Sequence, residues 1–66
     1  MAGLVVHLEA RRRAAGLTQA DLAEAASVSR KTINTVENGV FVPSTLLALR
    51  LAQVLGCSVH DLFELE

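Results

Sequence analysis

The sequence predicts an all-α fold of five short helices in one small domain. Apolar residues recur at spacings of three and four, Ala and Leu are abundant, and the β-branched residues form no long alternating run. The chain of 66 residues is 52% hydrophobic, which argues against disorder. A chain of this size buries only roughly 60% of its unfolded surface. We therefore expect a single aliphatic core and no deep substrate pocket.

The first helix is expected at about residues 4–15, and Gly16 is placed to end it because Gly tolerates the left-handed cap conformation. The residues expected on its inner face are Val5, Leu8, Arg12 and Ala15. The second helix is expected at about residues 19–26. Thr18 is a suitable N-cap for it, and Asp21 completes a capping-box pattern.

The third helix is expected at about residues 30–38, with Ser29 as its N-cap and Gly39 after its end. Residues 40–43 then form a connector, because Pro43 disfavours helix in the residue before it.

Two helices are expected after the connector, at about residues 45–55 and 59–65. Their expected caps are Ser44 and Gly56 for the fourth helix, and Ser58 with Asp61 in a second capping box for the fifth. The chain shows no internal repeat and no linker, so residues 1–66 are predicted to form one domain.

Charge is unevenly distributed along the chain. The formal net charge is −1, whereas nucleic-acid-binding domains are usually basic. Five of the six basic residues nevertheless lie in one part of the sequence, and they are Arg11, Arg12, Arg13, Arg30 and Lys31. Every charged residue after Arg50 is acidic. One end of the molecule can therefore be positive although the whole is slightly negative.

Several classes of protein are disfavoured. The single cysteine, Cys57, cannot form an internal disulfide and is expected to be a small buried side chain. No charge-free run approaches the ~18–20 residues of a membrane span, and apolar residues precede the arginines, the reverse of a signal peptide. The cytoplasm is the expected compartment.

Chemistry at a catalytic or metal site is equally poorly supported. His60 and Glu64 share a helix face, but two ligands without a third make a poor metal site, and His7 has no evident partner. No credible Ser–His–Asp arrangement exists. We expect no catalytic residues, no metal and no cofactor, and predict that the protein is not an enzyme.

Residues 18–38 predict two helices joined by a tight turn, with Ala23 as the small residue where they cross. Apolar contacts are expected from Leu22, Ala26, Val28, Ile33 and Val36. If Ile33 and Val36 face the core, the polar and basic side chains of the third helix point elsewhere, namely Arg30, Lys31, Asn34, Thr35 and Asn38. Such a helix suits the reading of base edges in the major groove of DNA, and the layout is that of a helix-turn-helix.

A set of residues spread over nearly the whole chain has matching spacings in a known family. The set is Arg12, Gly16–Leu17–Thr18–Gln19, Leu22–Ala23, Val28–Ser29, Ile33, Glu37–Asn38–Gly39, Pro43–Ser44, Leu51–Ala52, Leu55–Gly56 and Asp61–Leu62–Phe63. In these residues the chain resembles the Xre family, the phage Cro and lambda-type repressors. The resemblance implies a compact five-helix lambda-repressor-like domain that binds DNA through its second and third helices.

The resemblance also implies roles for individual residues. Gln19 corresponds to a glutamine that contacts a phosphate and braces the third helix. The residues that match positions facing phosphates or base edges are Ser29, Arg30, Lys31 and Thr35, with Asn34 beside them and Asn38 at a phosphate. Arg12 and Glu37 match a buried ion pair between the first and third helices. Ser27 stands where the family usually has a left-handed Gly, and Arg11 where an apolar residue is common. For Arg11 and Arg13, phosphate contact and simple solvation remain alternatives.

The fourth helix carries two apolar stripes, and a short bundle cannot easily bury both. The stripe expected to face the core is Thr45, Ala48, Leu49, Ala52 and Leu55. The second stripe is Leu47, Leu51 and Val54, which either packs under the fifth helix and the connector or forms a homodimer interface. A dimer would present two recognition helices about 34 Å apart, which matches half-sites one DNA turn apart.

These observations predict a sequence-specific transcriptional regulator that binds double-stranded DNA as a homodimer. From the family resemblance we expect a repressor that binds a pseudo-palindromic operator. The alternatives are a protein-interaction or antitoxin-like module, and the N-terminal DNA-binding part of a larger ligand-responsive regulator. No membrane partner and no small-molecule ligand are indicated.

Overall fold

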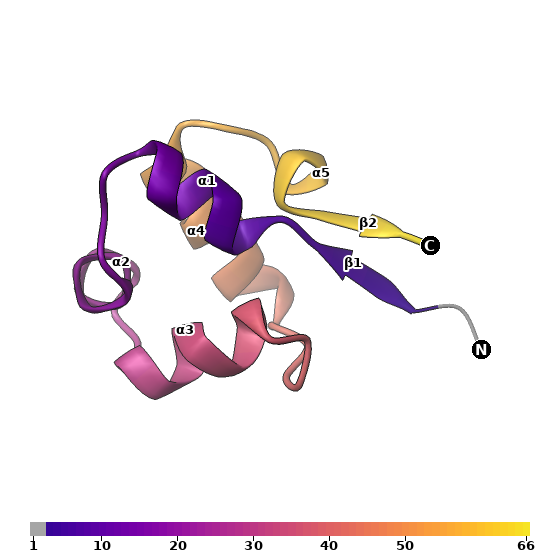
Figure 1. The fold of residues 1–66 in the computed structure, drawn as a ribbon, viewed down its shortest axis with the longest axis horizontal. Helices are drawn as coiled ribbons and strands as arrows, with labels where there is room; N and C mark the ends of the chain where they lie inside the picture. Colours follow the sequence, from indigo (N-terminus) through magenta and orange to yellow (C-terminus); the bar gives the residue numbers. More distant parts are fainter. Residues whose placement is uncertain (1–2) are drawn as a thin grey trace.

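The computed structural model describes residues 3–66, which fold as a helical body with a short two-stranded ribbon (Figure 1). The elements in chain order are β1 (Leu4–Val6), α1 (Leu8–Ala14), α2 (Gln19–Ala26), α3 (Arg30–Glu37), α4 (Thr45–Leu55), α5 (Val59–Leu62) and β2 (Phe63–Leu65). The five predicted helices are confirmed, and the bounds of α2 and α4 agree with the prediction. The ribbon extends from the helical body and carries both chain ends, away from α2 (Figure 1).

The helical predictions for the two chain ends were wrong. Leu4–Val6 and Phe63–Leu65 form β1 and β2, which pair antiparallel, with Leu4 opposite Leu65. The first helix begins only at Leu8. Segments of three residues are too short to show a period, and their pairing partner lies at the other end of the chain. The ribbon takes Val5 out of the predicted inner face of α1.

The core lies where the helices meet. Its fully buried large side chains are Leu8, Leu22, Ile33, Val36, Leu51 and Leu62. Cys57 is half-buried and packs against the edge of this core. Every helix contributes at least one of the six side chains, so the core holds α3 in place from within.

Of the two alternatives for the second stripe of α4, packing inside the molecule against α5 is confirmed and the dimer interface was wrong. Leu47 and Leu51, proposed as part of a dimer interface, are only 7% and 0% exposed, and Val54 packs against the core. Leu49, assigned to the core, is 56% exposed. The reason is that α4 packs against α2 and α5 at once, so one wide face is buried and contains most of both predicted stripes.

The predicted helix caps are confirmed. Thr18 with Asp21 and Ser58 with Asp61 form complete capping boxes, and the hydroxyl of Ser29 caps α3. The pKa values of both Asp carboxyls lie below their ordinary value, mainly because each accepts a hydrogen bond from the backbone amide of its capping residue. These local bonds define where the helices begin.

A buried ion pair joins α1 to α3. Arg12 Nε and Nη2 donate to the two carboxylate oxygens of Glu37, at 2.6 and 3.2 Å, and Arg12 Nη1 donates to the Leu17 carbonyl at 3.0 Å. Gln19 Nε2 donates to the same carboxylate at 2.9 Å. The hydrogen bond with Glu37 raises the pKa of Arg12 above its ordinary value. Both helices that precede α3 are thus anchored to one carboxylate near its end.

We expect Arg12→Ala to destabilise the fold by about 3–5 kcal/mol, because the change leaves the Glu37 carboxylate buried without its cation. Urea unfolding followed by circular dichroism measures the difference. Arg13→Ala is the matched control, since Arg13 pairs with Glu9 at the surface and should contribute less than about 1 kcal/mol. Equal losses for the two variants would contradict a structural role for the buried pair.

The turn between α2 and α3 is strained at Ser27, which has φ 60° and ψ 42°. This left-handed conformation, expected from the sequence, costs a residue with a Cβ atom roughly 1 kcal/mol. We expect Ser27→Gly to increase the free energy of unfolding by up to about 1 kcal/mol and so to raise the melting temperature. Ser27→Ala keeps the Cβ atom and removes only the hydroxyl, so it should bring no such gain. A lower melting temperature for the Gly variant would count against strain at this turn.

Candidate nucleic-acid interface

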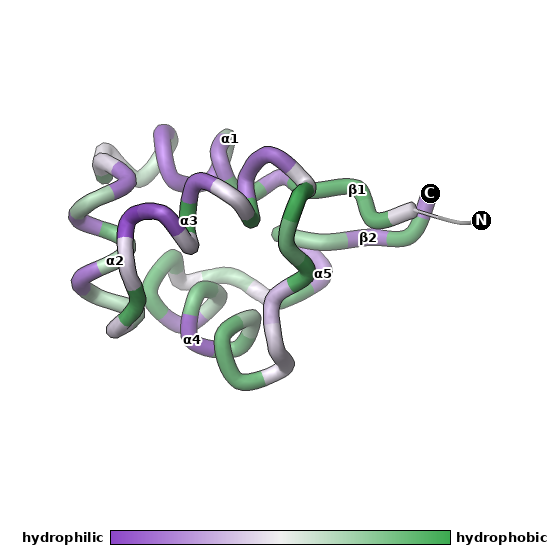
Figure 2. Tube along the Cα trace, turned by 90° about the horizontal axis from the view of Figure 1, so that it is seen from below, coloured by the Kyte–Doolittle hydropathy of each residue, from purple (hydrophilic) through white to green (hydrophobic). Residues whose placement is uncertain are grey.

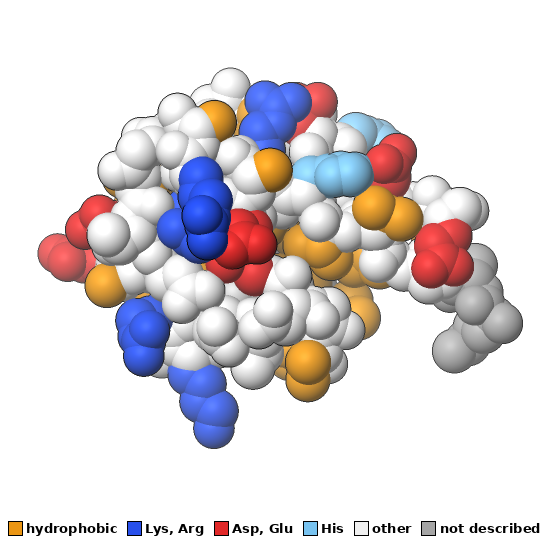
Figure 3. Space-filling view, in the orientation of Figure 1, with side chains coloured by type: hydrophobic (Ala, Val, Ile, Leu, Met, Phe, Trp, Pro, Cys, Tyr) orange, Lys and Arg blue, Asp and Glu red, His pale blue; other side chains and the backbone are white. Residues whose placement is uncertain are grey.

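Helix α3 buries one side and exposes the other. Ile33 and Val36 are both 0% exposed, as predicted, and they fix the rotation of the helix about its axis. Arg30, Lys31 and Asn34 are exposed on the outer surface. Figure 3 shows basic side chains protruding at the lower left, over the start of α3. The structure therefore presents the polar face of α3 to solvent along its whole length.

The other predicted contact residues lie on or beside this face. Ser29 and Asn38 are exposed at the two ends of α3, and Thr35 is half-buried. Asn38 Nδ2 donates to Asn34 Oδ1 at 3.2 Å, so these two amides form a pair with donors and acceptors still available to a partner. Gln19 is half-buried and uses its amide nitrogen to hold Glu37. Through this hydrogen bond, Gln19 of α2 is connected to the last turn of α3.

Ion pairing separates the basic residues into two groups. Arg11 lies 3.5 Å from Asp61, and Arg13 lies 3.0 Å from Glu9. Among residues 3–66, by contrast, Arg30, Lys31 and, on α4, Arg50 form no ion pair. Two cations at the start of α3 therefore keep their full charge for an external anion, while those on the outside of α1 are partly neutralised.

Sequence reasoning missed Thr32 and the connector as parts of this surface. Together with predicted contact residues they line a shallow hollow along one flank of α3, whose lining is Ser29, Lys31, Thr32, Thr35, Val40 and Phe41. The i, i+3 spacing of Thr32 from Ser29 was a usable signal. The approach of the connector to α3 was not, because it depends on how the chain turns after Gly39.

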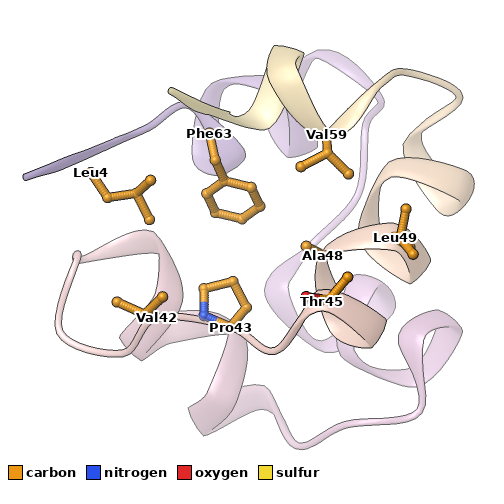
Figure 4. A pocket seen from close by; sticks show the side chains of 8 residues that line it. All are labelled: Leu4, Val42, Pro43, Thr45, Ala48, Leu49, Val59 and Phe63. Atoms are coloured by element: carbon orange, nitrogen blue, oxygen red, sulfur yellow. The ribbon is translucent and has the colours of Figure 1, made fainter. Parts of the chain in front are cut away.

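A second hollow lies on another side of the molecule and is apolar (Figure 4). It has a volume of about 230 Å³ and lies between the ribbon, the connector and α4. Its lining is Leu4, Val42, Pro43, Thr45, Ala48, Leu49, Val59 and Phe63, with the Phe63 ring facing into it (Figure 4). No titratable side chain lines this cleft, so it offers apolar contact and no acid–base chemistry.

His7 differs from its predicted environment. His7 was predicted to have no partner, but its Nε2 lies 2.6 Å from Glu64 Oε1, because strand pairing brings the two chain ends together.

Within residues 3–66, no three His, Cys, Asp or Glu side chains are grouped so that they could hold a metal ion. None of the helices in this part of the chain combines the length and apolar character needed to cross a membrane.

Comparison with known proteins agrees with this geometry. The helix-turn-helix family matches residues 8–62. The chain is 45% identical over 56 residues to a helix-turn-helix-type transcriptional regulator of Methanothermobacter thermautotrophicus, covering 83% of this chain and 81% of that protein. It is 39% identical over 51 residues to the helix-turn-helix-type transcriptional regulator YgzD of Bacillus subtilis, covering 77% of each.

Solved structures show the same fold. The restriction-modification controller protein C.AhdI of Aeromonas hydrophila superposes with a TM-score of 0.79 at 31% identity, covering 83% of each chain. The clp gene regulator ClgR of Corynebacterium glutamicum superposes with a TM-score of 0.78 at 35% identity, and this chain, 82% of which is covered, spans 57% of that one. With an exposed recognition helix, a family match over most of its length and relatives that are transcriptional regulators, this chain belongs to the Xre-like helix-turn-helix family of DNA-binding transcriptional regulators.

Proposed function

We propose that this protein is a cytoplasmic repressor that binds a pseudo-palindromic operator as a homodimer, with α3 in the major groove. One observation supports the docking above all others. The exposed face of α3 begins with two cations, Arg30 and Lys31, that have no carboxylate partner among residues 3–66. Arginine suits the O6 and N7 atoms of guanine, and lysine can reach guanine or phosphate. Repression follows from occlusion, since a bound dimer competes with polymerase for the site.

The remaining contacts follow from position on α3. Asn34 and Thr35 lie near the middle of the exposed face and are assigned to base edges. Ser29 and Asn38 lie at its ends and, with Gln19 at the start of α2, are assigned to the phosphate backbone. In this proposal the protein acts by binding and has no catalytic role.

The homodimer needs a surface other than the one expected from the sequence. Seven large apolar side chains are exposed in residues 3–66, and all of them lie in the ribbon, the connector and α4: Leu4, Val40, Phe41, Val42, Leu46, Leu49 and Leu65. Figure 2 shows a hydrophobic (green) stretch after α3, separated from the green residues of α4 by a pale, weakly hydrophilic stretch. The residues from Gly39 to Leu49 also include no charged side chain.

The size of this surface suits a second copy of the chain. A standard interface buries roughly 800 Å² per partner, of which about 65% is apolar in homodimers. Five of these side chains do not line the hollow beside α3, namely Leu4, Val42, Leu46, Leu49 and Leu65, and they supply exposed apolar area on the order of 500 Å². In an isologous interface the exposed Leu46 and Leu49 of one α4 face the apolar cleft of the other. We therefore assign these five side chains to self-association.

A protein-interaction module is the second candidate, and the same exposed apolar surface is the observation that favours it. Binding to random genomic DNA fragments distinguishes the two functions. The regulator enriches a shared motif, whereas an interaction module enriches none.

Arg30→Ala/Lys31→Ala should abolish this enrichment, because the double variant removes the unpaired cations from α3. The matched control is Arg11→Ala/Arg13→Ala, which changes the net charge equally but removes cations that already pair with carboxylates. This control should retain the motif. If the control loses the motif and the α3 variant keeps it, DNA binds at the cations of α1 and the proposed interface at α3 is wrong.

Affinity for the selected operator should fall with salt. If cationic side chains of each subunit neutralise ~3 phosphates, the logarithm of the association constant should fall against the logarithm of salt concentration with a slope near −5 for a dimer. Fluorescence anisotropy at several salt concentrations measures this slope. A slope near zero is incompatible with the docking described above.

Leu49→Glu should convert the homodimer to a monomer, because it places a charge in the proposed apolar interface. Analytical ultracentrifugation across a concentration series measures the change. Ala20→Glu adds the same charge to the exposed side of α2 and should leave the dimer intact. If wild-type protein sediments as a monomer at every concentration tested, or if Leu49→Glu dimerises like wild type, the surface is not a dimer interface.

A further inference from the structure

We propose that the free edge of β1 pairs with the same edge of a second copy, so that two ribbons join into one four-stranded antiparallel sheet. This inference rests on the proposed homodimer and specifies how its two subunits are joined. The ribbon extends from the helical body, away from α2 (Figure 1). β1 therefore lies at the periphery of the fold.

The hydrogen bonds of the ribbon show which backbone groups face its partner strand. The His7 amide donates to the Leu62 carbonyl at 2.8 Å, and the Glu66 amide donates to the Gly3 carbonyl at 3.2 Å. Both pairs belong to the register that sets Val5 opposite Glu64. The odd-numbered residues of this segment therefore direct their N–H and C=O groups toward β2.

Leu4 and Val6 direct their backbone groups the other way, to the outer edge of β1. Within the part of the chain from Gly3 to Glu66, these amides and carbonyls are not hydrogen-bonded. The outer edge of β2 differs, because the Phe63 amide already donates to the Val59 carbonyl. Of the two edges of the ribbon, β1 thus offers the complete set of donors and acceptors.

The edge of β1 is complementary to itself. A two-fold axis beside Val5 places Leu4 of each copy opposite Val6 of the other in antiparallel register. Each such pair exchanges two hydrogen bonds, so the dimer gains about four. β1 has the sequence Leu-Val-Val, so no like charges meet across the new pair. A second copy of this chain is therefore the partner that the edge fits.

Edge pairing also supplies what the exposed apolar surface lacks. An interface of standard size carries about 10 direct hydrogen bonds, whereas the five side chains assigned to self-association are all apolar. Two of them, Leu4 and Leu65, lie opposite each other in the ribbon. A strand of three residues is too short to hold two chains together by itself. The sheet and the apolar contacts therefore act together in one interface.

Disulfide cross-linking tests the register. In a Cys57→Ser background, Val5→Cys should give a disulfide-linked dimer in oxidised glutathione, because the two Val5 positions form a non-hydrogen-bonded pair with Cα atoms about 4.5 Å apart. Glu64→Cys in the same background is the matched control, since Glu64 lies opposite Val5 within the ribbon. Its two copies would be three strand spacings apart, about 14 Å, which a disulfide cannot span. Non-reducing gel electrophoresis measures both yields.

Proline variants test the hydrogen bonds. Leu4→Pro removes an outward amide from β1, and Leu65→Pro removes one from β2 at the opposite position of the ribbon. We expect Leu4→Pro to raise the dissociation constant of the dimer about thirtyfold, because each dimer loses two hydrogen bonds. Leu65→Pro makes the same side-chain change and should weaken the dimer far less. Analytical ultracentrifugation measures both constants, and circular dichroism checks that each variant is folded.

The outcomes separate edge pairing from the proposed function. If the wild-type chain is a monomer at every concentration, the proposed homodimer is wrong and edge pairing fails with it. If the wild-type chain dimerises but Val5→Cys cross-links no better than Glu64→Cys, the homodimer stands and edge pairing is overturned. Equal weakening of the dimer by the two folded proline variants would overturn it as well.

Discussion

The position of the recognition helix depends on one buried carboxylate. Glu37 accepts hydrogen bonds from Arg12 of α1 and Gln19 of α2, so the last turn of α3 is joined to both helices that precede it. At the other end of α3, the Ser29 hydroxyl caps the helix. In between, Ile33 and Val36 are fully buried. An α-helix fastened at both ends and along one side has little freedom to rotate, and a fixed rotation is needed for reading base edges.

The same network explains how a chain of net charge −1 belongs to a DNA-binding family. Acidic side chains lie beside the cations of α1, where Glu37 holds Arg12, Glu9 pairs with Arg13 and Asp61 pairs with Arg11. Among residues 3–66, no carboxylate pairs with Arg30 or Lys31 of α3. Two unpaired cations therefore stand at the start of α3, and the net charge of the whole chain is a poor guide to its partner.

Exposed apolar groups follow from the small size of the fold. Since α4 is packed by two helices at once, its remaining face has no neighbour left in a chain of this length, and Leu46 and Leu49 stay exposed. The connector is short and lies on the surface between α3 and α4. Its two sides thus border two different hollows, one beside the recognition helix and one beside the ribbon. The proposed contacts with DNA and with a second copy are therefore adjacent on the molecule.

Local chemistry in the sequence determined where α2, α3, α4 and α5 begin and which face of α3 is exposed. A capping hydroxyl acts within three residues, and a buried helix face repeats within four. Only the tertiary structure decided the rest. The contact of His7 with Glu64 joins positions 57 residues apart, and the β1–β2 ribbon likewise pairs the two ends of the described chain. The burial of Leu47 and Leu51 depends on two helices closing around α4 together. Such contacts leave no periodic trace in a short segment, because the partner that creates them is elsewhere in the chain.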